Sequence, residues 1–220
     1  MSASAKKAIF DRLLAATAGP GLPRPAVPVL PRRADVPATD FATFEAALTV
    51  LGPTFALARD PEEARTALAA VVARHGVTTA VRWDHPDLDA VAAASVLAQA
   101  GVTVLAPEDF PTRPCPSLAA VDMGLTGVDH ALCATGSLVL TTGYGRERAT
   151  ALVPRLHVAL VAKSRLLPDL PALFDRLAGR PLPAAVTCVT GVSSTGDIEF
   201  VYVRGVHGPL RVHVIGLDWL

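Results

Sequence analysis

From residue 39 onward, the chain alternates between apolar positions at helical spacing and short, nearly continuous apolar runs. Phe41, Phe44 and Leu48 recur at intervals that place them on one face of a helix, for which Thr39 or Asp40 is the expected N-cap. Asp60-Pro61-Glu62-Glu63 carries an N-cap, a first-turn proline and first-turn acids, in the order that opens a helix. The pattern predicts helices at 39–52, 60–75 and 86–100 and strands at 54–58, 77–83 and 102–105. Strands that alternate with helices in this way favour parallel βαβ units.

After residue 117 the spacing changes, because polar segments rich in glycine replace the long helices between strands. We expect strands at 118–121, 131–133, 138–141, 157–162, 185–190 and 210–217, and helices at 146–152 and 170–178. The whole pattern predicts an α/β fold, a three-layer α/β/α sandwich, with an irregular insert near the strand ends. Open α/β sheets usually bind their ligands in that region.

The first 38 residues have a different character. Ile9, Leu13 and Leu14 lie at helical spacing, and Gly19-Pro20 ends the helix predicted over residues 3–18. Six prolines between residues 19 and 38 prevent regular pairing and favour an extended tether. We therefore expect an N-terminal helix on a proline-rich tether over residues 1–38, followed by one α/β domain over residues 39–220.

Composition excludes several classes of protein. With 51% apolar residues in a chain of 220, one sizeable core is expected, and 20 basic against 20 acidic residues argue against a nucleic-acid partner. Every apolar run is too short to span a membrane, so we expect a cytoplasmic protein without a membrane partner. Cys115, Cys133 and Cys188 are odd in number and widely separated, which argues against a disulfide framework or a metal site within this chain.

Two hydroxyl-rich segments are candidates for anion binding. In Ala134-Thr-Gly-Ser137, Thr135 and Ser137 can present hydroxyls, while Gly136 can let a ligand oxygen approach the backbone. A tight hairpin turn explains the same segment equally well. Thr126 belongs to a similar segment, residues 124–129, and Arg148 opens a helix where an anion is favoured, although a solvated helix start is the alternative.

Carboxylates and a histidine near the C-terminus are candidates for acid–base chemistry. Asp197 and Glu199 share one face of an extended segment that also contains Ser193 and Thr195, although a solvated strand edge has the same pattern. His207 lies in a loop opened by glycines and stiffened by Pro209. Among the remaining histidines, His157 and His213 are expected to be structural residues within strands. His75 and His85 lie at element ends and are expected on the surface, and His130, beside Asp129, is a further candidate.

Five motifs in order resemble a known family. They are Asp122-Met-Gly-Leu-Thr126-Gly-Val-Asp129, Ala134-Thr135-Gly136-Ser137-Leu138, Arg148 through Pro154 to His157, Gly191 through Asp197 to Glu199, and Gly205-Val-His207-Gly-Pro209. Together they resemble the lactate-utilisation C proteins, the LutC/YkgG or LUD-domain family. The resemblance implies a fold like that of sugar-phosphate isomerases and CoA transferases. It also implies a subunit of an assembly that oxidises L-lactate to pyruvate.

The same resemblance implies partners and a site. Iron–sulfur clusters are expected in LutA-like and LutB-like partner proteins, with no cofactor bound by this chain alone. A small carboxylate or phosphate is expected to bind Thr126, Thr135, Gly136, Ser137, Arg148, Ser193, Thr195 and Glu199. His207 and Asp197 are expected to position or deprotonate the substrate, all in one hollow at one end of the sheet.

Two departures from the family pattern keep other functions open. The family usually has a glutamate where this chain has Ala134, so a covalent carboxylate mechanism does not carry over. Val192 and Gly196 also replace the usual residues of the loop that contains Ser193. The alternatives are a self-sufficient isomerase or acyl/CoA-transferase-like enzyme on the same fold, and a non-catalytic scaffold subunit.

Overall fold

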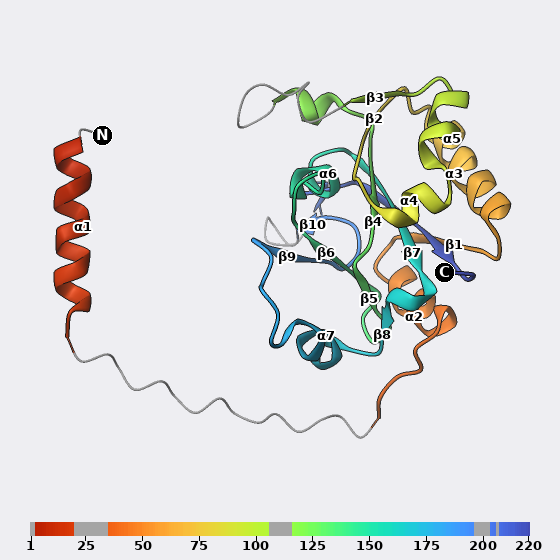
Figure 1. Cartoon of the computed structure of the whole chain (residues 1–220). Coiled ribbons are helices and arrows are strands. Elements are labelled where there is room, and N and C mark those ends of the chain that lie inside the picture. The colour runs from red at the N-terminus through yellow and green to blue at the C-terminus, as the bar shows by residue number, and fades with distance from the viewer. Residues whose placement is uncertain (1–2, 20–34, 106–115, 196–202, 206) are drawn as a thin grey trace. The chain divides into compact units, whose positions relative to one another are not determined.

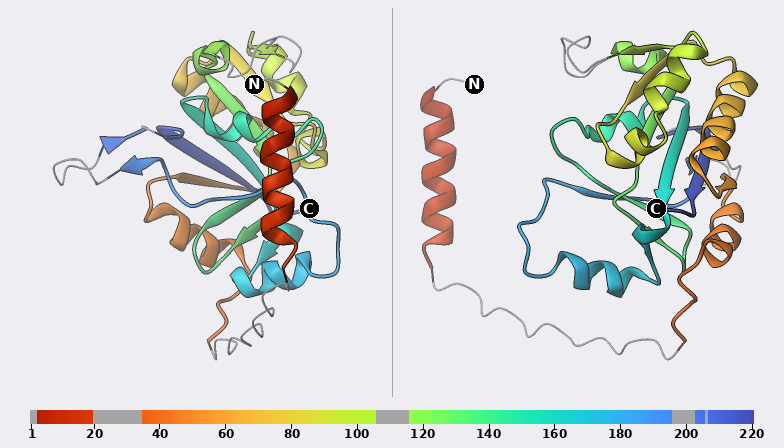
Figure 2. Two further views of the ribbon diagram at one scale, coloured as in Figure 1. Left: turned by 90° about the vertical axis from the view of Figure 1, so that its left-hand side faces the viewer. Right: turned by 45° about the vertical axis from the view of Figure 1, so that its right-hand side comes forward.

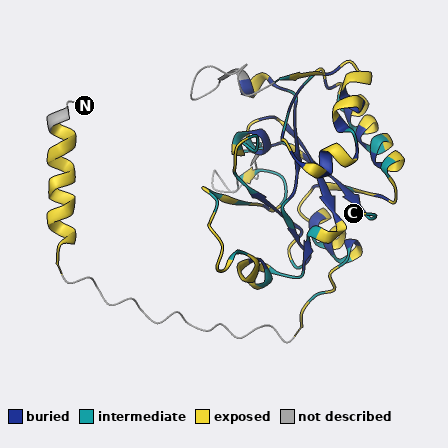
Figure 3. Cartoon of the chain, in the orientation of Figure 1, coloured by how far each residue is buried: buried dark blue, intermediate teal, exposed yellow. Residues whose placement is uncertain are grey.

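A computed structural model describes residues 3–19, 35–105, 116–195, 203–205 and 207–220. The chain divides into two compact units, Met1–Arg33 and Ala34–Leu220. The first contains helix α1 (Ala3–Thr17), whose apolar side chains Ile9, Phe10, Leu13 and Leu14 are all exposed (Figure 3). The domain boundary expected after residue 38 stays a prediction.

The second unit is built on a parallel sheet (Figure 1). Six strands pair in the order β1-β12-β7-β4-β2-β3, and every pairing between neighbours is parallel. Their bounds are β1 Thr54–Ala58, β2 Thr79–Arg82, β3 Thr103–Leu105, β4 Met123–Gly127, β7 Leu156–Ala162 and β12 Arg211–Leu217. The predicted α/β class with a mostly parallel central sheet is confirmed.

Helices cover both faces of this sheet (Figures 1 and 2). Helices α3 (Pro61–His75) and α5 (Ala93–Gln99) lie over one face, and α6 (Arg148–Leu152) packs against β4 on the other. Helix α2 (Phe41–Thr49) precedes β1, α4 (Pro86–Ala90) follows β2, and α7 (Leu170–Leu177) precedes β9. The predicted caps hold, because Asp40 and Asp60 accept hydrogen bonds from the first turns of α2 and α3.

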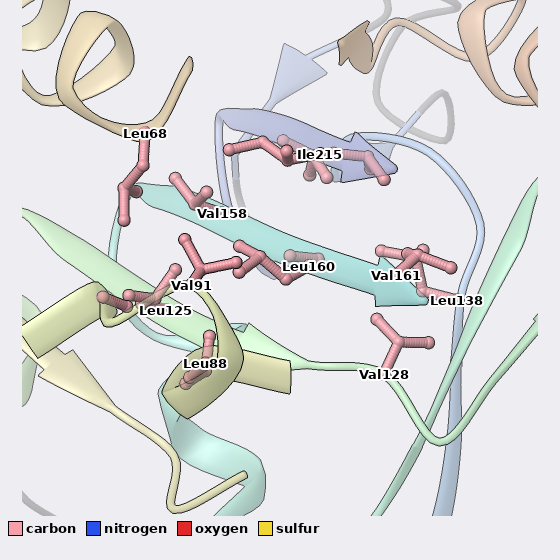
Figure 4. Close-up of a cluster of buried hydrophobic side chains, with 14 of the residues drawn as sticks. Leu68, Leu88, Val91, Leu125, Val128, Leu138, Val158, Leu160, Val161 and Ile215 are labelled. Atoms are coloured by element: carbon pink, nitrogen blue, oxygen red, sulfur yellow. The ribbon is translucent and has the colours of Figure 1, made fainter. Parts of the chain in front are cut away.

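A second, smaller sheet pairs in the order β8-β5-β6-β9, and α7 packs against its strands β5 and β8. Its strands are β5 His130–Leu132, β6 Ser137–Thr141, β8 Leu166–Leu167 and β9 Val186–Val189. A short hairpin of β10 (Ser194–Thr195) and β11 (Val203–Arg204) follows. Figure 4 shows Leu138 of β6 close to Val161 of β7 and Val128, so the core is continuous between the two sheets.

Three local predictions are wrong. No strand forms at 118–121, because residues 118–120 belong to a 3-10 helix, Pro116–Ala120. The glycine-rich segment expected to be irregular around Gly124 is instead strand β4, buried along its whole length. Its glycines are needed for packing, since a Cβ on Gly124 would come within 1.8 Å of the Thr150 carbonyl oxygen in α6. The single helix expected at 86–100 is divided into α4 and α5, because Ala92 adopts a positive φ of 54°.

Candidate functional site

Polar side chains gather where β2, β4 and β7 end. Because these strands are parallel, the segments that follow them meet at one edge of the sheet, the edge where open α/β sheets usually bind ligands. We call five residues there the carboxyl-edge cluster: His85, Asp87, Asp129, Arg146 and Arg165.

The innermost members are His85 and Asp87, which are 1% and 5% exposed. The Nδ1 atom of His85 accepts a hydrogen bond of 3.2 Å from the backbone N–H of Asp87 and so caps helix α4. A neutral His85 therefore carries its proton on Nε2. The Asp87 Oδ2 atom lies 3.7 Å from His85 Nδ1 and has no hydrogen-bond partner within the described chain.

Burial perturbs both groups. Removal from water raises the pKa of Asp87, while the nearby charges of His85 and Arg165 oppose that change. Removal from water also lowers the pKa of His85, while Asp87 opposes it. A buried acid and a buried base with displaced pKa values, in contact at a strand end, are typical of acid–base sites.

Two arginines supply positive charge to the cluster. The Arg146 guanidinium donates to Asp129 Oδ1 at 3.1 Å and to the backbone oxygen of Asp84 at 3.2 Å. Asp129 is also held by Thr141, whose N–H and hydroxyl both donate to its Oδ2 atom. Arg165 is held less tightly, because its Nη2 atom lies 3.9 Å from Asp87 Oδ1 and its side chain is 36% exposed. Arg146 is therefore fixed in the structure, whereas Arg165 is partly exposed and lies too far from Asp87 for a hydrogen bond.

Gly127 makes this arrangement possible. A Cβ at that position would lie 2.0 Å from His85 Nδ1 and would collide with the imidazole ring. The glycine that ends β4 therefore allows the buried histidine to pack directly against the strand.

The predicted residues Thr135 and Ser137 belong to a different part of the molecule. The Thr135 hydroxyl lies 2.7 Å from that of Ser137, which in turn lies 2.7 Å from that of Thr190 beyond β9. Gly136, between them, adopts a φ of +63°, and a Cβ there would lie 2.3 Å from the backbone nitrogen of Leu48 in α2. The space beside Gly136 is thus filled by a helix.

Ser193, Thr195 and His207 lie together on the small hairpin and its flanks. The backbone N–H of His207 donates to Ser193 Oγ at 3.2 Å, and Thr195 pairs with Val203 across the hairpin. Two residues, Gly191 and Val192, separate Ser193 from Thr190, whose hydroxyl contacts that of Ser137. Asp197 and Glu199 lie outside the described residues.

Thr126 and Arg148 lie elsewhere. Thr126 is fully buried in β4, where its hydroxyl lies 2.9 Å from Nε2 of the equally buried His157 in β7. Its hydroxyl is therefore occupied within the core. Arg148 is exposed at the first turn of α6, close in sequence to Arg146.

The predicted residues therefore do not all meet in one place. His207 lies four residues before β12 begins, at the amino edge of the sheet, whereas Asp129 follows β4 at the carboxyl edge. A seven-residue strand such as β12 separates these edges by about 20 Å. The motif that ends at Asp129 and the loop of His207 therefore lie at opposite edges of the sheet.

Sequence reasoning missed the innermost part of the cluster. His85 was expected on the surface but is 1% exposed, because the segment after β2 turns inward over Gly127. Neither Asp87 nor Arg165 lies within one of the five motifs. The available signal was positional: His85 and Asp87 follow one predicted strand, and Arg165 follows another.

A cavity of about 250 Å³ lies on the face of the sheet that α3 covers, between α3 and strands β1 and β12. Its lining is mainly apolar, with Thr54, Arg74 and His213 as its polar members. Both ring nitrogens of His213 are already engaged, one by Thr54 and the other by His75 at 2.8 Å. Among its described lining residues, Arg74 is the one charged side chain, and His213 has no ring nitrogen left to bind a ligand.

Two further findings concern metals and membranes. Among the residues that the structure describes, no three histidine, cysteine or acidic side chains are grouped so as to hold a metal ion. Within the same residues, no helix has the length and apolar character needed to cross a membrane.

Comparisons with known proteins find relatives named lactate utilization protein C and YkgG. Lactate utilization protein C from Halalkalibacterium halodurans is 29% identical over 153 residues, which cover 67% of this chain and 66% of that protein. The uncharacterized protein YkgG of Escherichia coli is 33% identical over 94 residues, covering 40% of this chain and 41% of its own length. The match thus spans about two thirds of the first relative and less than half of the second.

A structural comparison supports the fold. A crystal structure of a DUF162 family protein from Deinococcus radiodurans superimposes with a TM-score of 0.53 and 21% identity, covering 80% of this chain and 95% of that one. The family model of the LUD domain matches residues 42–216, which is most of the chain and nearly all of its α/β unit. This protein therefore belongs to the LUD domain family, in the branch that includes the LutC and YkgG proteins.

Proposed function

We propose that this protein acts in the oxidation of L-lactate to pyruvate, as one subunit of an assembly whose iron–sulfur clusters belong to partner proteins. The observation that carries the proposal is the match of residues 42–216 to the LUD domain, together with relatives named lactate utilization protein C. The match and these names together support a role in lactate utilisation. We propose in addition that the protein works in an assembly whose other subunits carry the iron–sulfur clusters.

The reaction sets clear requirements. Conversion of lactate to pyruvate releases two electrons and two protons, so it needs an electron acceptor as well as a group that binds the anionic substrate. Iron–sulfur clusters in the partners accept the electrons one at a time, and the protons pass to solvent. The role left to this chain is to bind and orient a small carboxylate, for which Arg165 of the carboxyl-edge cluster is suited.

Genetic complementation tests the function directly. A Halalkalibacterium halodurans strain that lacks its own lactate utilization protein C is expected to regain growth on L-lactate when it expresses this chain. Growth on glucose is the control for general fitness. A well-expressed, folded chain that restores no growth on L-lactate would contradict the proposal.

Purification tests the assembly. Tagged full-length protein, isolated from its native cells under anaerobic conditions, should retain cysteine-rich partners that carry iron and sulfide. That complex should reduce an artificial electron acceptor when L-lactate is added. Turnover of a sugar phosphate or an acyl-CoA by the isolated chain would instead favour the isomerase or CoA-transferase alternative. Full complex activity after substitution of every polar residue tested would favour a scaffold.

A further inference from the structure

We propose that the carboxyl-edge cluster is a binding site for a small 2-hydroxy acid, in which Arg165 binds the carboxylate and Asp87 accepts a hydrogen bond from the hydroxyl. The inference rests on the proposed function and names the residues that would meet the substrate. Neither residue belongs to the motifs by which the family is recognised in the sequence.

The buried Asp87 side chain has an acceptor oxygen without a partner. A buried oxygen without a hydrogen-bond partner costs about 1–3 kcal/mol, so nearly all buried polar atoms are satisfied in folded proteins. Asp87 Oδ2 is unsatisfied, although its side chain is only 6% exposed. A ligand hydroxyl would supply the missing donor, because a carboxylate oxygen only accepts.

The spacing of the Arg165 guanidinium and the Asp87 carboxylate suits a 2-hydroxy acid. In a 2-hydroxy acid the carboxylate and the hydroxyl are attached to adjacent carbons, so their binding groups must also be neighbours. The Arg165 guanidinium lies 3.9 Å from one oxygen of Asp87, too far for a hydrogen bond but close enough for both groups to contact one small ligand. Arg165 is also partly exposed, which gives a ligand from solvent a group to meet first.

The other members of the cluster, Asp129, Arg146 and His85, are held firmly in place. Asp129 and Arg146 are fixed by each other and by Thr141, so they form one rigid wall of the site. His85 is fixed by its bond to the Asp87 backbone and by Gly127 behind its ring. A site whose supporting residues are locked, while two groups retain unused binding capacity, is preorganised for a ligand.

The location provides independent support. The cluster follows the carboxyl ends of β2, β4 and β7, where parallel α/β sheets usually bind their ligands. The hydroxyls of Thr135, Ser137 and Thr190, by contrast, already satisfy one another.

A binding experiment separates the two roles. The full-length chain is titrated with L-lactate and with propionate, which has the carboxylate but no hydroxyl, and binding is followed by calorimetry or by amide shifts. Wild-type protein should prefer L-lactate by about tenfold, the value of one hydrogen bond to a charged group. Arg165→Gln should weaken both ligands by about tenfold or more and leave that preference intact, whereas Asp87→Ala should abolish the preference.

Matched controls exclude general damage. Arg155→Gln removes an exposed arginine before β7, at the opposite edge of the sheet, and should bind both ligands like wild type. Arg165→Lys keeps the charge and should restore part of the affinity that Arg165→Gln loses. Since Arg165 is partly exposed, its variants are informative even if Asp87→Ala fails to fold. Equal binding by wild type and Arg165→Gln overturns the inference, as does a folded wild-type chain that shows no saturable binding of L-lactate.

The inference and the proposed function fail in different ways. If wild-type protein and Arg165→Gln both restore growth on L-lactate equally well, the function stands and this site is wrong. If L-lactate binds with the expected dependence on Arg165 and Asp87 but wild-type protein restores no growth, the site stands and the role in lactate oxidation is wrong.

Discussion

The buried histidine His157 should make the stability of this protein sensitive to acid. His157 is fully buried in β7, and burial lowers its pKa to about 4 from an ordinary value of 6.5. Between these two values the unfolded chain binds a proton on this residue and the folded chain does not. The free energy of unfolding therefore falls as the pH drops from 6.5 towards 4, and it is unaffected by His157 above that range.

The expected size follows from the shift. A displacement from 6.5 to about 4 corresponds to about 3 kcal/mol, at about 1.4 kcal/mol for each pH unit. His213, whose pKa burial and the neighbouring His75 also lower to about 4, adds a similar loss. Since domains are stable by about 5–15 kcal/mol, these two histidines together bring the protein close to unfolding near pH 4.

The test is a comparison of wild-type protein with His157→Gln. Urea unfolding, followed by the fluorescence of the buried Trp83, is measured at pH 7.5, 6.5, 5.5 and 4.5. The variant should be less stable at pH 7.5, because it loses the packing of the ring and alters the contact with Thr126. This difference should shrink below pH 6.5 by up to about 1.4 kcal/mol for each pH unit.

The matched control is Leu182→Gln, which changes a side chain that is 72% exposed and does not titrate, retains His157 and should keep the pH slope of the wild-type protein. A difference between wild type and His157→Gln that stays constant from pH 7.5 to 4.5 would refute the reasoning. The folded protein would then bind a proton on His157 as readily as the unfolded chain does.

Three other predictions concern packing and organisation. Gly136→Ala should reduce the free energy of unfolding by about 1–3 kcal/mol in urea titrations, because its Cβ would press on the backbone of Leu48, and an unchanged midpoint would show that α2 can move aside. Thr126→Val should cost about 1–3 kcal/mol, because it leaves Nε2 of His157 without a partner in the core, and the same change combined with His157→Gln should cost less than the sum. Deletion of residues 1–33 should leave the urea midpoint of the α/β unit unchanged, since that unit has its own core, and a lower midpoint would contradict this.

The sequence by itself determined the elements that depend on local chemistry. Asp40 and Asp60 cap their helices as expected, because a carboxylate satisfies the first backbone N–H groups wherever the helix packs. Gly76 ends α3 in the left-handed conformation, which glycine adopts without strain. The alternation of apolar runs and helices likewise determined the class of fold, since both periodicities arise from burial of one face or stripe of each element.

The candidate site shows how far sequence reasoning reaches. The motif order indicated the family and included Asp129, but nothing local marked Asp87 or Arg165 as partners. Their proximity depends on β2 and β7 lying on either side of β4, and strand order is a property of the whole sheet. Thr126 and Ser137 were grouped because both lie in hydroxyl-rich segments, yet one is in the core and the other beside α2.

Only the tertiary structure decided the roles of the glycines and histidines. In a sequence, a glycine that admits a ligand looks the same as one that admits a helix, and Gly124 and Gly136 both prove to face helices. Likewise, His85 and His207 each follow a strand or precede one, and only packing buries the first and exposes the second. The physical reason is that close approach and burial are set by neighbours distant in the chain, whereas capping and periodicity are set by neighbours within one or two turns.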